Sequence, residues 1–173
     1  GNGDFKLFNM EGLEKLRMQI VDNAGRLYLR NNLGNPIAVM QASEFSDGEL
    51  ILNSVLNNTT VYLGANDNAG GRMRIFSQND KLAMDMTEIE GEGNLKIFNK
   101  DSIDIVTLQS VSGDGSVDLR NQKGILSAFL ASSENGGALH VNDGIKDANT
   151  RGVFQGSEFG GFLALYNAKK LDP

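Results

Sequence analysis

The sequence predicts an all-β fold made of a repeated unit, a repetitive β-helix or β-solenoid of about eight units of 22–24 residues. Three observations predict it. A glycine recurs at this spacing along the chain, each such glycine opens a short alternation of apolar and polar residues, and the alternation ends at a small polar residue. The period therefore indicates that residues 1–173 form a single repeat array. The units start near Gly3, Gly25, Gly48, Gly71, Gly93, Gly115, Gly137 and Gly161.

The first strand of each unit carries two apolar residues that are two positions apart. Side chains two apart in a strand share a face, so this spacing predicts one apolar face and one polar face. We expect the apolar face to be the core. The pairs are Phe5/Leu7, Leu27/Leu29, Leu50/Leu52, Met73/Ile75, Leu95/Ile97, Val117/Leu119, Leu139/Val141 and Leu163/Leu165.

A turn is predicted two residues after each pair, where Asn, Asp or Ser can hydrogen-bond nearby backbone. These residues are Asn9, Asn31, Ser54, Ser77, Asn99, Asn121, Asp143 and Asn167. Three residues later, Gly12, Gly34 and Gly124 supply a positive φ. Other residues stand there in the remaining units, so the turn is expected to differ between units. They are Asn57, Asp80, Ser102 and Lys146.

A second strand is predicted in each unit, at 16–20, 38–42, 61–65, 84–86, 106–108 and 128–130. An acidic, glycine-rich turn such as 22–25 then leads to the next unit. Residues 10–20 also have apolar spacing like a helix face, but the equivalent residues of other units do not continue a helix, which favours a strand. The seventh unit carries extra residues, after which 152–159 copy 38–45.

Two architectures can bury the apolar face of such a unit. One chain can coil alone as a monomeric solenoid, or three identical chains can wrap around a common axis. A wide private interior must be filled at close-packed density, and many inward positions here are small, such as Ala38, Ala65 and Ala128. The sequence therefore favours an intertwined homotrimeric fibre.

The units resemble the shaft repeats of phage tail fibres and of related fibres encoded by bacteria and large viruses. The resemblance rests on the pattern G-x-L-x-L-x-N-x-x-G at 25–34 and its copies at 3–12 and 115–124. It implies a homotrimeric structural shaft, on a virion or outside the cell, that acts as a rigid spacer for host or receptor attachment. The chain is expected to be a fragment of a longer fibre protein, whose other regions contact a glycan or receptor.

Composition and motifs favour a structural protein over an enzyme. The net charge of −6 disfavours binding to nucleic acid, and no apolar run is long enough for membrane insertion. Cysteine is absent, and no motif for a catalytic site, cofactor or metal is present. His140, the single histidine, is expected to point outward in a column with Asp118 and Ala164. Residues 67–70 come closest to a calcium loop but read as an ordinary turn.

One outward column could contact a ligand or another chain, because its aromatic and basic side chains can stack on sugars or pack between chains. Its candidate residues are Phe8, Arg30, Phe76, Phe98, Arg120 and Tyr166, and Asn53 and Asn142 complete the column. Two alternatives to the shaft stay open. One is a monomeric right-handed β-solenoid that binds or cleaves polysaccharide, and the other is a self-stacking extracellular filament subunit.

Overall fold

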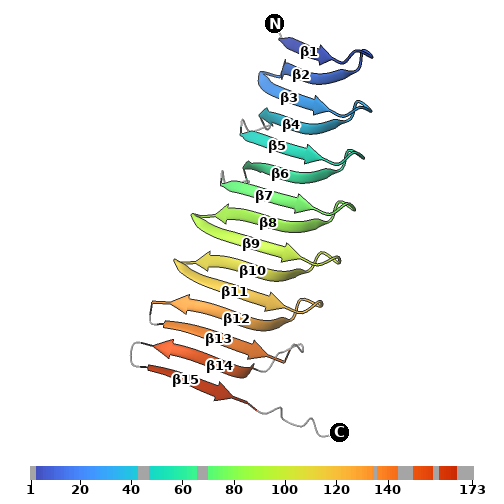
Figure 1. Cartoon of the computed structure of the whole chain (residues 1–173). Coiled ribbons are helices and arrows are strands. Elements are labelled where there is room, and N and C mark those ends of the chain that lie inside the picture. Colours follow the sequence, from blue (N-terminus) through green and yellow to red (C-terminus); the bar gives the residue numbers. More distant parts are fainter. Residues whose placement is uncertain are drawn as a thin grey trace. The chain divides into compact units, whose positions relative to one another are not determined.

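The protein is all-β (Figure 1). The computed structural model describes residues 3–42, 47–65, 70–134, 136–143, 150–157 and 160–166. These residues contain fifteen strands and no helix. The strands are β1 (Asp4–Phe8), β2 (Glu14–Val21), β3 (Ala24–Arg30), β4 (Pro36–Ala42), β5 (Gly48–Asn53), β6 (Thr59–Ala65), β7 (Gly71–Phe76), β8 (Leu82–Ile89), β9 (Glu92–Phe98), β10 (Asp104–Val111), β11 (Asp114–Arg120), β12 (Leu126–Ser133), β13 (Gly136–Asn142), β14 (Thr150–Ser157) and β15 (Gly160–Leu165).

The predicted strands are confirmed: each of the first seven repeats contributes two strands, and the eighth contributes β15. The segment with helix-like spacing forms β2, because its alternating residues pair with β1 and β3. The internal copy in the seventh unit is confirmed in part, since 152–157 lie in β14 as 38–42 lie in β4.

The chain divides into two compact units, Gly1–Glu90 and Gly91–Pro173. In the first unit, strands β1 to β8 pair antiparallel, each with the next in sequence. In the second unit, strands β9 to β15 pair in the same manner. Each unit is an open meander, in which every two successive glycine-led strands have one other strand between them. Their separation is then roughly 9–10 Å, twice the spacing of neighbouring strands.

The turn after each glycine-led strand has one conformation in six repeats. In the 31–35 turn, Gly34 N–H donates to Asn31 O (3.1 Å) and Asn31 N–H to Asn35 O (2.9 Å). The Asn31 Oδ1 atom accepts from the N–H groups of Leu33 (2.9 Å) and Asn35 (3.0 Å). The predicted role of this polar residue in the turn is thus confirmed.

For the six described turns, the expectation that this turn differs between units was wrong. A positive φ occurs at the same place whether or not glycine stands there, at Gly12 (79°), Gly34 (82°), Asn57 (67°), Asp80 (57°), Ser102 (63°) and Gly124 (80°). The same hydrogen bond back to the first turn residue closes all six. Asn, Asp and Ser accept this backbone conformation at a modest energetic cost. The seventh position, Lys146, lies outside the described residues.

Among the described residues, the turns between repeats at 22–23, 90–91 and 112–113 are two-residue hairpins. Asp22 and Asn23 join β2 to β3 with φ of 51° and 64°, and Ser112 and Gly113 join β10 to β11 with φ of 55° and 85°. Two consecutive positive φ values define a type I′ turn, whose twist matches the flanking strands. The acidic and glycine-rich composition of these segments therefore reflects backbone geometry.

The apolar face is not buried in the single chain. Among the described residues only two apolar side chains are buried, Val39 and Val153, each 7% exposed. Both lie on the opposite face, and so do the buried Asp85 and Thr107. Among the described residues of each unit nothing packs over the apolar face, because they form a single layer.

Candidate interaction face

Each unit has a continuous apolar face made of two parallel rows of side chains. The strand register sets the rows, because each apolar residue lies directly opposite another on the neighbouring strand. In the first unit one row is Phe5, Met18, Leu27, Met40, Leu50, Leu63, Met73 and Met86. In the second unit its counterpart is Leu95, Leu108, Val117, Leu130, Leu139, Phe154 and Leu163. The second row lies two residues further along the glycine-led strands, from Leu7 onward in the first unit and from Ile97 onward in the second.

Many side chains in these rows are more exposed to solvent than is usual for apolar residues. Phe5, Met18 and Met40 are 52–54% exposed in the first unit. In the second unit, Leu130 is 50% and Phe154 is 54% exposed. A contiguous apolar surface on this scale marks an interaction site, because isolated apolar side chains, not continuous rows, are normal on a soluble surface.

A third row, here called the small row, flanks the apolar rows at the ends of the strands where one repeat joins the next. Its members face the same side and are mostly small: Gly25, Ala42 and Gly48 in the first unit, where Ile20 lies opposite Gly25, and Gly115, Ser132 and Gly137 in the second. In the first unit the small row leaves a groove of about 1030 Å³ beside Phe5, Met18 and Met40. The apolar face is therefore about two side chains wide and bordered by exposed backbone.

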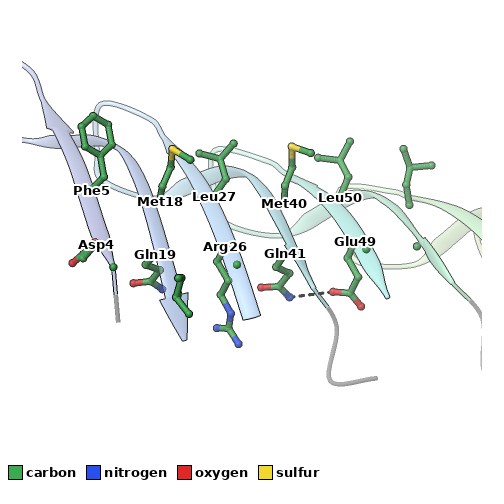
Figure 2. A pocket seen from close by; sticks show the side chains of 16 residues that line it. Asp4, Phe5, Met18, Gln19, Arg26, Leu27, Met40, Gln41, Glu49 and Leu50 are labelled. Atoms are coloured by element: carbon green, nitrogen blue, oxygen red, sulfur yellow. Dashed lines mark hydrogen bonds between the residues drawn. The ribbon is translucent and has the colours of Figure 1, made fainter. Parts of the chain in front are cut away.

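The two faces of the first unit are clearly separated in Figure 2, which labels five adjacent pairs of residues. Phe5, Met18, Leu27, Met40 and Leu50 stand on one side of the sheet, and Asp4, Gln19, Arg26, Gln41 and Glu49 on the other. Gln41 Nε2 donates to Glu49 Oε2 at 3.0 Å. Strict alternation along each strand produces this separation.

The polar face is held by its own ion pairs and hydrogen bonds. In the first unit, Arg17 of β2 binds Asp4 of β1 with Nε at 3.0 Å and Nη2 at 3.1 Å. The Arg30 Nε atom lies 2.8 Å from Glu14 Oε1. In the second unit Arg151 Nη2 lies 2.7 Å from Asp143 Oδ2. These three arginines are therefore neutralised by carboxylates of the same face.

The Asp4 carboxyl and the Arg17 guanidinium shift each other's titration. The hydrogen bond from Arg17 is the main cause that lowers the pKa of Asp4, with Lys6 adding to it and burial opposing it. The same bond raises the pKa of Arg17. Both groups stay charged at neutral pH.

The predicted ligand or contact residues lie on the polar face, at the ends of glycine-led strands or just beyond. Phe8 (57%) and Tyr166 (53%) are exposed, whereas Phe76 and Phe98 are half-buried. Arg30 and Arg120 bend back to their own turns, donating to Gly34 O (2.9 Å) and Gly124 O (3.3 Å). Consecutive members of this column have a strand between them, so their side chains do not form one stack.

His140 lies on the polar face of β13, and its register is as predicted. Phe129 is its neighbour on β12, and Asp118 lies one strand further, so an aromatic ring separates histidine from carboxylate. The ring centroids of Phe129 and His140 are 6.1 Å apart. Asp118 is engaged by Arg120 at 3.0 Å.

The described residues contain no group of three or more His, Cys, Asp or Glu side chains that could hold a metal ion. The candidate calcium loop at 67–70 lies almost wholly outside the described residues, with only Gly70 inside them. No helix within the described ranges is long and apolar enough to cross a membrane.

One feature of the polar face was missed from the sequence, a groove beside Tyr62, Arg74 and Phe76. The missing information was the register, which sets Tyr62 opposite Arg74 across β6 and β7.

Comparison with known proteins gives no relative from which a role can be transferred. No protein-family model matches the chain, and no curated protein matches it.

Proposed function

We propose that this chain is a structural segment of a homotrimeric β-helical fibre, a shaft that serves as a rigid spacer for receptor or host attachment. The observation that carries the proposal is the continuous apolar face of each unit, which is exposed in the single chain. A sheet that is apolar on one side must bury that side against another layer. A second and third copy of the same chain supply such layers.

The width of the apolar face favours three copies. The face is two side chains wide, about 7 Å along the strand from first to second residue. A narrow strip from each of three chains can meet at one axis, and the flanking row, which apart from Ile20 includes Gly and Ala residues, lets neighbouring backbones approach closely where these small residues stand. A two-layer sandwich is usually built from broader faces.

The polar face suits the outside of such a shaft. It is rich in charged and polar side chains, several of them in ion pairs within the sheet, so it can face solvent, and charged side chains limit unwanted association between strands. The resemblance of the repeats to fibre shafts agrees with this arrangement. The shaft would lie on a virion or outside the cell, with receptor binding assigned to regions beyond this chain.

The test is the absolute mass of the purified chain in solution, measured by light scattering. We expect three times 18.7 kDa. A monomer would favour a single-chain fold, and open-ended polymers would point to a self-stacking filament. A dimer would contradict the proposal of three chains.

A matched pair of variants tests which face joins the copies. Leu95→Asp places a charge on the apolar face of β9, and Asn94→Asp places the same charge on its polar face. We expect Leu95→Asp to dissociate the trimer, because a buried, unpaired charge costs about 3–5 kcal/mol. Asn94→Asp should keep the trimeric mass. If Leu95→Asp also keeps it, the apolar face is not the contact.

A further inference from the structure

The polar face of the first unit carries a groove of about 440 Å³. Ile51, Tyr62 and Arg74 are neighbours in one cross-strand row and form its floor. Phe76, at the end of β7, is part of the lining, and the turn residues Asn57 and Asp80 reach it from the two sides. The volume is within the usual range of small-molecule sites.

Tyr62 provides a fixed aromatic surface. Its hydroxyl lies 3.2 Å from Glu49 Oε1 and 3.4 Å from Ala65 O, and the ring lies over Gly64. A Cβ atom at Gly64 would come within 2.7 Å of the ring carbon Cζ, so a larger residue there would force the ring to move. Burial, followed by the nearby Glu49 carboxylate, raises the pKa of Tyr62, which keeps the phenol neutral.

Arg74 contributes a positive charge that is only weakly paired. The Asp85 carboxylate binds Arg72 through two short contacts, at 2.9 and 2.5 Å. Arg74 Nε lies 3.7 Å from the same carboxylate, and this nitrogen is buried and has no hydrogen-bond partner among the described residues. The Arg74 side chain as a whole is 34% exposed and lines the groove. The exposed part of the guanidinium can therefore contact an anionic ligand.

We infer that this groove binds a sugar residue that carries a carboxylate, such as a uronic acid. The rings of Tyr62 and Phe76 match the apolar face of a sugar, and Arg74 matches its carboxylate. Asn57 and Asp80, both exposed at the rim, can hydrogen-bond sugar hydroxyls. The site is on one chain and on the face opposite the apolar rows, so it does not depend on the proposed trimer.

The combination occurs once in the repeat array. The corresponding residues one repeat earlier are Val39, Ile51 and Asn53, which lack the ring and the charge. In the second unit, Thr107, Asp118 and Arg120 occupy one such set, with the charges arranged differently. This difference between repeats indicates a local specialisation on an otherwise regular face.

The test is ligand-observed saturation-transfer NMR on the whole chain, with methyl β-glucuronide and the uncharged methyl β-glucoside as probes. We expect the glucuronide to bind with a dissociation constant on the order of 1 mM, and the glucoside about tenfold more weakly. Arg74→Gln should abolish the preference for the glucuronide. Arg17→Gln removes the same charge from the same face outside the groove, and should retain the preference.

The contribution of the rings is tested with Phe76→Leu, which keeps an apolar side chain but removes the ring. We expect its saturation transfer from both sugars to fall several-fold while its circular dichroism is unchanged. Equal binding of the two sugars by the unmodified chain would overturn the proposal. So would an unchanged preference in Arg74→Gln, or displacement of the glucuronide by acetate at the same concentration, because a bare carboxylate would then suffice.

Discussion

Six turns need a residue with positive φ, and three of them use Asn57, Asp80 and Ser102 in place of glycine. Each such residue stabilises the native turn less than glycine does, since a side chain is strained in the left-handed region. Asn and Asp offset part of the strain, because their short side chains can hydrogen-bond locally. Ser does so more weakly. The largest remaining strain is therefore expected at Ser102.

We predict that Ser102→Gly stabilises the protein by about 0.5–1 kcal/mol, the strain released less the extra entropy of glycine in the unfolded chain. Urea unfolding of the variant and the parent measures the difference. Gly34→Ala is the converse control. Nothing lies within 4 Å of the position where its Cβ would be, so the substitution causes no clash and adds only the strain of a positive φ. It should therefore destabilise the protein by a similar amount. A neutral Ser102→Gly would mean that the turn is relaxed with serine.

At the scale of the element, the ion pair between Asp4 and Arg17 joins β1 to β2. The pKa of Asp4 lies below its ordinary value of 3.8 in the folded chain. A lowered folded pKa stabilises the fold above the unfolded pKa, and this contribution is lost as pH falls through the folded value. We therefore predict that β1 loosens below about pH 4 while its pairing is constant above pH 5.

NMR titration of the Asp4 carboxyl carbon measures this shift directly. In Arg17→Gln we expect the pKa of Asp4 to move back toward 3.8, with Lys6 holding it slightly below, since Lys6 Nζ is 3.2 Å away. An unaltered pKa in Arg17→Gln would assign the shift to Lys6 alone.

The strands and turns were largely predictable from the sequence, because both depend on local patterns. Alternation in 25–34 places Leu27 and Leu29 on one face wherever the strand pairs. The turn at Asn57 was not predicted to match that at Gly34, because the backbone bonds of the turn, rather than the residue type, impose its positive φ. The groove at Arg74 needed the cross-strand register, which joins residues from two repeats.

For the whole molecule, the sequence could not say what covers the apolar face. Burial of Leu108 or Leu130 depends on atoms outside the strand that carries it, and in the single chain these residues are 40% and 50% exposed. Apolar burial is the main stabilising contribution to folding, and here one layer of strands supplies little of it. If copies of the chain supply the rest, stability and assembly are linked.

The last prediction follows from that linkage. For a trimer that unfolds to three free chains, the melting temperature rises with protein concentration, because assembly favours the native state by mass action. With about 0.7 kcal/mol of unfolding enthalpy per residue, the rise should be about 3 °C for each tenfold increase. Calorimetry over a hundredfold range of protein concentration, with scans slow enough for reversibility, measures this rise.

The two variants at β9 serve as controls. Asn94→Asp should show the same dependence of melting temperature on concentration. Leu95→Asp should melt at a lower temperature that does not depend on concentration, since an isolated chain has no partner to lose. A parent whose melting temperature is constant across the range would mean that one chain folds alone, and that its apolar face is covered in some other way.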